Sequence, residues 1–89
     1  MRHLDIKIYG RVQGVFFRDS TLKKALDLGI RGFIKNEPDG SVYIEAEAGK
    51  EKLEEFLDWC RQGPRWAEVR KIDFQYTDLK NFNDFIIKY

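Results

Sequence analysis

The chain has 89 residues, of which 16 are basic and 15 are acidic, so its formal net charge at pH 7 is +1. This length predicts a single domain over residues 1–89, and an apolar content of 43% is enough to build a hydrophobic core. The near-neutral total argues against a polycationic nucleic-acid arm. The sequence has no 18-residue apolar run and no pattern of a secretory signal, so we expect a cytoplasmic protein that does not bind membranes.

The first half of the chain shows a strand, a helix and a second strand. Apolar and polar residues alternate over positions 4–9, which predicts a half-buried strand. A glycine-bounded loop follows, and a helix is expected from about Arg18 to a stop near Gly29. The apolar side chains at helical spacing that should face the core are Leu22, Ala25 and Leu26. Residues 30–36 are expected to form the second strand.

The second half of the chain shows a strand, a helix and two further strands. A turn at 37–40, with Pro38 and Gly40, precedes an alternating strand at 42–48. An amphipathic helix follows and should end at Gly63; its apolar stripe consists of Leu53, Phe56, Leu57 and Cys60. Alternation over 72–76 and again over 85–87 predicts the last two strands.

The order β-α-β-β-α-β with a further C-terminal strand is typical of the α+β, ferredoxin-like split βαβ fold. We expect an antiparallel sheet with two helices on one face. The first two strands should run parallel with the third between them. The loop after the first strand, the start of the first helix and the end of the second strand then meet at one edge of the sheet.

Two features of that edge are candidates for chemistry. The loop from Gly10 to Arg18 contains two glycines and leads into a helix N-terminus, which together with the guanidinium of Arg18 suits a phosphate dianion. The alternative is a plain tight connection, with Arg18 a solvated cation that opposes the helix dipole by roughly 0.3–1 kcal/mol. Asn36, at the end of the second strand, has an amide that can hold a water in a fixed direction, or it can simply initiate the turn.

Three segments resemble the signatures of the acylphosphatase family: residues 12–18 (VQGVFFR), 32–42 (GFIKNEPDGSV) and 63–69 (GPRWAEV). The resemblance extends over nearly the whole chain and implies a hydrolase that splits acyl phosphates into a carboxylate and inorganic phosphate. It implies that Arg18 and Asn36 are catalytic and that inorganic phosphate or sulfate is a ligand. The residues that it assigns to phosphate binding are Gln13, Gly14, Val15, Phe16, Phe17 and Arg18.

For this chemistry we expect no cofactor and no metal ion. One cysteine excludes an internal disulfide, one histidine excludes a His-rich metal site, and no Asp-x-Asp loop is present. We expect a monomer whose partner is a small-molecule acyl phosphate rather than a nucleic acid. Lys35 is a further candidate for the positive corner around Arg18.

The remaining polar residues have plainer interpretations. His3 is expected at the surface, and Asp5, Lys7, Glu45 and Glu47 are expected to form a solvated sheet face. Two other functions stay open: a catalytically idle anion-binding or regulatory module of the same fold, and an RNA-binding module of the RRM type. The RRM alternative has Tyr9 and Tyr43 as stacking aromatics but lacks the expected aromatic motif and basic surface.

Overall fold

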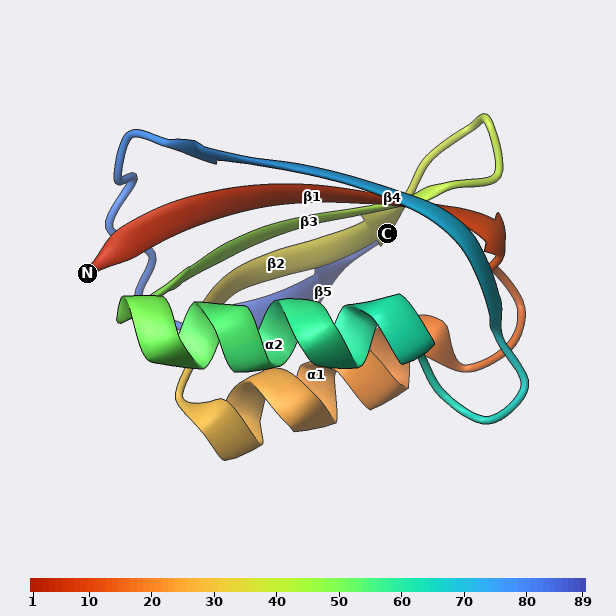
Figure 1. The fold of residues 1–89 in the computed structure, drawn as a ribbon, viewed down its shortest axis with the longest axis horizontal. Coiled ribbons are helices and arrows are strands. Elements are labelled where there is room, and N and C mark those ends of the chain that lie inside the picture. The colour runs from red at the N-terminus through yellow and green to blue at the C-terminus, as the bar shows by residue number, and fades with distance from the viewer.

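The computed structural model describes all 89 residues, as five strands and two helices (Figure 1). The elements are β1 (Arg2–Arg11), α1 (Phe17–Leu28), β2 (Arg31–Asn36), β3 (Val42–Ala48), α2 (Lys50–Gln62), β4 (Glu68–Thr77) and β5 (Phe85–Lys88). The predicted order is confirmed. No helix has both the length and the apolar composition needed to cross a membrane.

The five strands form one sheet in the order β4-β1-β3-β2-β5. β3 is antiparallel to both β1 and β2, so β1 and β2 run parallel, as expected. β5, whose direction the sequence did not indicate, pairs parallel with β2 and makes the sheet mixed. Both helices lie on the same face of the sheet (Figure 1), which is the ferredoxin-like arrangement.

The hydrophobic core is one cluster of 17 buried residues between the helices and the sheet. The stripe of α2 that the sequence predicted is buried in it, because residues at i, i+3, i+4 and i+7 share one helix face. In α1 the prediction was wrong for Leu26, which is 63% exposed. The buried residues of α1 are Phe17, Thr21 and Ala25, a row at i, i+4 and i+8 that leaves Leu26 on the solvent side.

The sheet face opposite the helices is not the solvated surface that alternation predicted. His3, Glu45 and Glu47 are all buried there. The reason is the β4–β5 connection, which folds over this face and donates its own backbone N–H groups to the carboxylate of Glu47. The prediction of a surface histidine and a solvated acidic face was therefore wrong for these three residues.

Candidate active site

The loop between β1 and α1 presents backbone donors that the protein does not use. None of the backbone N–H groups from Gly14 to Asp19 donates a hydrogen bond within the chain, and the first helical bond is Ser20 N–H to the carbonyl of Phe16. Phe16, the residue that caps α1, has a left-handed backbone (φ 61°, ψ 24°), and Gly14 also has positive φ (73°). Non-glycine residues adopt this conformation at a cost of about 1–3 kcal/mol and do so mainly at functional sites. Consecutive free N–H groups in such a loop form a concave anion receptor.

Arg18 and Asn36 lie on the wall of one cavity of about 270 Å³, next to this loop. Arg18 is in the first turn of α1, and Asn36 is the last residue of β2. They come together because β1 and β2 run parallel, so that the start of α1 and the end of β2 reach the same edge of the sheet. Gly14, Phe16 and Phe17 also line the cavity.

The side chain of Asn36 has an unpaired acceptor at this cavity. Its Oδ1 is buried and accepts no hydrogen bond from the protein. Buried polar atoms normally have a partner, because an unpaired one costs about 1–3 kcal/mol. An unpaired carbonyl on the wall of an anion-receptor cavity is therefore suited to accept a hydrogen bond from a water molecule.

Known proteins are similar to this chain in sequence over nearly its whole length. The acylphosphatase family model matches residues 4–87. The chain belongs to this family. It is 43% identical over 83 residues to the acylphosphatase of Thermoplasma volcanium, covering 93% of this chain and 92% of that protein. It is 45% identical over 86 residues to the acylphosphatase of Thermus thermophilus, covering 93% and 98%.

The structural comparison agrees with the sequence comparison. The crystal structure of the acylphosphatase from Bacillus subtilis superposes with a TM-score of 0.97 at 32% sequence identity, and the match covers 100% of both chains. This chain is therefore an enzyme of the acylphosphatase type, a hydrolase of acyl phosphates.

Two of the residues that the family resemblance assigned to phosphate binding, Gln13 and Val15, do not line the cavity that Arg18 and Asn36 share. The side chain of Val15 packs against the core. The side-chain amide of Gln13 points to the β2–β3 turn, where Nε2 donates to the carbonyls of Glu37 (2.8 Å) and Ser41 (2.9 Å). Gln13 therefore ties the loop to the turn that follows Asn36.

That turn is held by a second local contact. The carboxylate of Asp39 accepts hydrogen bonds from the hydroxyl and the backbone N–H of Ser41. These bonds, with a smaller contribution from Lys7, lower the pKa of Asp39 to about 2. Asp39 is thus ionised at neutral pH and keeps the turn closed.

Lys35 does not belong to the positively charged group around Arg18. Strand residues alternate between faces, and Lys35 is on the face opposite Asn36, with its Nζ 5.8 Å from the centre of the Tyr43 ring. The Arg65–Trp66 pair, a guanidinium 4.8 Å above the indole ring, is also absent from the cavity wall.

The sequence missed Tyr89, which lines the cavity and whose ring centre lies 4.9 Å from the Arg18 guanidinium carbon. Its position follows from the parallel pairing of β5 with β2, in which Lys88 is opposite Lys35 and Tyr89 comes one residue beyond. The sequence did not indicate the direction of β5, and without it the position of Tyr89 could not be predicted. Val12 and Asp19, which also line the cavity, were not singled out either.

Proposed function

We propose that this acylphosphatase clamps the phosphoryl group of its substrate with Arg18 and the loop N–H groups, while Asn36 holds the attacking water, and that no metal ion takes part. The observation that carries the proposal is the cavity wall that Arg18 and Asn36 share beside unpaired backbone donors. Phosphoryl transfer passes through a loose transition state and depends on positioning and charge stabilisation rather than on covalent chemistry by the protein.

The clamp is supported by the chemistry of its donors. A guanidinium fork binds two phosphoryl oxygens at once, and the N–H groups at the start of α1 add the partial positive charge of the helix. Of the phosphate-binding residues assigned from the family, Gly14, Phe16, Phe17 and Arg18 line the cavity and would surround the anion. The side chains of Gln13 and Val15 would shape this loop from behind.

The attacking water is assigned to Asn36 because of its unpaired Oδ1. A water that donates to Oδ1 keeps a lone pair for in-line attack on phosphorus, and the P–O bond to the carboxylate breaks on the opposite side. A carboxylate is a good leaving group, so it departs without a proton or a Lewis acid. We assign the proton of the water to a phosphoryl oxygen of the substrate, because the only histidine of the chain is remote from this cavity.

The test is the release of inorganic phosphate from benzoyl phosphate in the presence of EDTA. We expect catalytic turnover that EDTA does not reduce and that inorganic phosphate inhibits competitively. Tight phosphate binding without turnover would instead identify the idle anion-binding module. Turnover that EDTA abolishes and added metal restores would contradict the metal-free mechanism.

The RNA-binding alternative has little support from the sheet surface. In modules of the RRM type, bases stack on an open sheet face. Here that face carries Asp5, Glu45 and Glu47, and the β4–β5 connection covers part of it. We therefore expect no binding to single-stranded RNA in the same buffer in which benzoyl phosphate is hydrolysed.

A further inference from the structure

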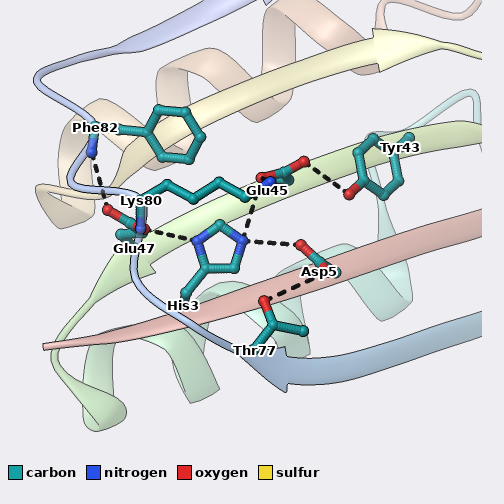
Figure 2. Close-up of polar contacts among 8 residues, drawn as sticks. All are labelled: His3, Asp5, Tyr43, Glu45, Glu47, Thr77, Lys80 and Phe82. Atoms are coloured by element: carbon teal, nitrogen blue, oxygen red, sulfur yellow. Dashed lines mark hydrogen bonds and ion pairs between the residues drawn. The ribbon is translucent and has the colours of Figure 1, made fainter.

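A buried polar cluster lies on the sheet face opposite the helices, around His3 (Figure 2). The imidazole is 0% exposed, and all of its polar contacts are to carboxylates. Nδ1 lies 2.7 Å from Glu47, whereas Nε2 lies 2.8 Å from Asp5 and 3.2 Å from Glu45. The cluster is far from the phosphate cavity, since His3 and Arg11 are at opposite ends of β1, about 26 Å apart at 3.3 Å per residue.

The cluster has an excess of negative charge. The carboxylates of Asp5, Glu45 and Glu47 face only two side chains that can be cationic, the imidazole of His3 and the ammonium of Lys80 on Glu45 (2.7 Å). Even with His3 protonated, one negative charge is left without a partner. Uncompensated charge is costly in a buried site. A divalent cation in place of the Nε2 proton brings one more positive charge to the cluster, which compensates for the ammonium of Lys80 when that side chain is displaced.

The spacing of the three inner atoms fits such an ion. Nε2 of His3, Oδ1 of Asp5 and Oε1 of Glu45 converge on one point of the sheet face, and the three ligating atoms lie within 4.8 Å of one another. Tetrahedral ligands at 2.0 Å from zinc are separated by about 3.3 Å. The observed separations from Nε2, 2.8 and 3.2 Å, need only a small outward rotation of the Asp5 carboxylate to reach that spacing.

The outer contacts of His3 are those of a metal-binding histidine. Such a histidine donates its other N–H to a carboxylate, which fixes the tautomer and the ring orientation. Here Glu47 accepts from Nδ1, and Glu47 itself is held by the backbone N–H groups of Lys80 (2.6 Å) and Phe82 (3.0 Å). The imidazole is therefore oriented with Nε2 toward Asp5 and Glu45 (Figure 2).

The site is also accessible to an ion from solvent. The side chain of Asp5 is 22% exposed and lines a surface groove of about 280 Å³ together with Lys7, Tyr43 and Asp73. The ammonium of Lys80, which occupies the same oxygen of Glu45 that a metal would use, is 55% exposed and can swing into solvent.

We propose that His3 Nε2, Asp5 and Glu45 bind one zinc ion, with Glu47 as the residue that orients the histidine. A solvent molecule from the groove would complete the tetrahedron. The ion would fasten the start of β1, through His3 and Asp5, to Glu45 of β3. It would take no part in hydrolysis, because it is bound at the other end and on the other face of the sheet.

The first experiment uses the wild-type chain, in which His3 is the only histidine. Protein freed of metal with a chelator is titrated with zinc, and binding is followed by calorimetry and by the ¹⁵N NMR signals of the imidazole. We expect one zinc per chain, with Nε2 losing its proton and Nδ1 keeping its own. No saturation up to millimolar zinc, or an imidazole that stays protonated on both nitrogens, would overturn the proposal.

Variants then separate a zinc site from a plain ion-pair network. Asp5→Asn should weaken zinc binding at least tenfold, and Glu47→Gln by about 10–100-fold. Lys80→Ala should tighten it severalfold, because the competing cation is removed while the backbone N–H on Glu47 remains. Asp73→Asn, in the same groove but outside the cluster, is the matched control and should bind zinc like the wild type. Equal affinity of Asp5→Asn and Asp73→Asn would overturn the assignment.

Discussion

At the residue scale, Arg18 is the side chain on which the proposed clamp depends most. It is in the first turn of α1, outside the buried row of that helix, so its replacement should not disturb the core. Arg18→Ala should reduce kcat for benzoyl phosphate by roughly 10³-fold, comparable to the loss of other phosphate-clamping arginines. Arg18→Lys keeps the charge but loses the planar fork, and should recover only part of the rate. Near-normal hydrolysis by Arg18→Ala would contradict the clamp.

Asn36 tests the other half of the mechanism. Asn36→Ala removes the unpaired Oδ1 and should lower kcat by about 10²–10³-fold, the scale of losing one preorganised contact. KM should change much less, because the clamp is intact. A rise in KM at unchanged kcat would make Asn36 a binding residue. Asp19→Asn is an informative companion variant, because Asp19 has a carboxylate on the cavity wall. A large loss of kcat in this variant would identify Asp19, rather than the substrate, as the group that accepts the proton of the water.

At the scale of elements, the side chain of Gln13 connects the loop between β1 and α1 with the β2–β3 turn. Gln13→Ala would leave the carbonyls of Glu37 and Ser41 without this donor and free the two segments to move relative to each other. Because a misplacement of about 1 Å can cost up to 10²-fold in rate, we expect kcat to fall roughly tenfold in a folded protein. Gln62→Ala, at the exposed end of α2, is the control that should keep the wild-type rate. Equal rates for the two variants would show that the link does not position Asn36.

The same elements show what could be predicted from the sequence. The right-handed crossover rule placed Arg18 and Asn36 at one sheet edge once the elements were known. Periodicity is a local property, so it predicted every strand and helix. It failed where a distant segment decides the environment. His3 and Glu47 alternate with core residues and should therefore face solvent, but the β4–β5 connection covers them. Tyr89 was missed for a related reason, since the pairing of β5 with β2 is a contact between distant segments.

At the scale of the whole molecule, stability depends on one core, and two leucines test which helix positions belong to it. Both are in helices, but Leu53 of α2 is 0% exposed and Leu26 of α1 is 63% exposed. Leu53→Ala should reduce the free energy of unfolding by about 2–5 kcal/mol. For a chain of this length that is a large part of a total on the order of 4–13 kcal/mol. Leu26→Ala leaves no cavity and should change the free energy of unfolding by no more than about 0.5 kcal/mol.

Urea unfolding followed by circular dichroism measures the free energy of unfolding of both variants, which carry the same leucine-to-alanine substitution at different positions. The two variants should also hydrolyse benzoyl phosphate at the wild-type rate while folded, because neither leucine lines the cavity that Arg18 and Asn36 share. If Leu26→Ala reduced the free energy of unfolding as much as Leu53→Ala does, α1 would have to bury a second apolar face in solution. The two helices contribute to the core to different extents because the apolar stripe of α2 is wholly buried. In α1 the buried row includes Thr21, and the backbone N–H groups at the start of the helix have no partner within the chain.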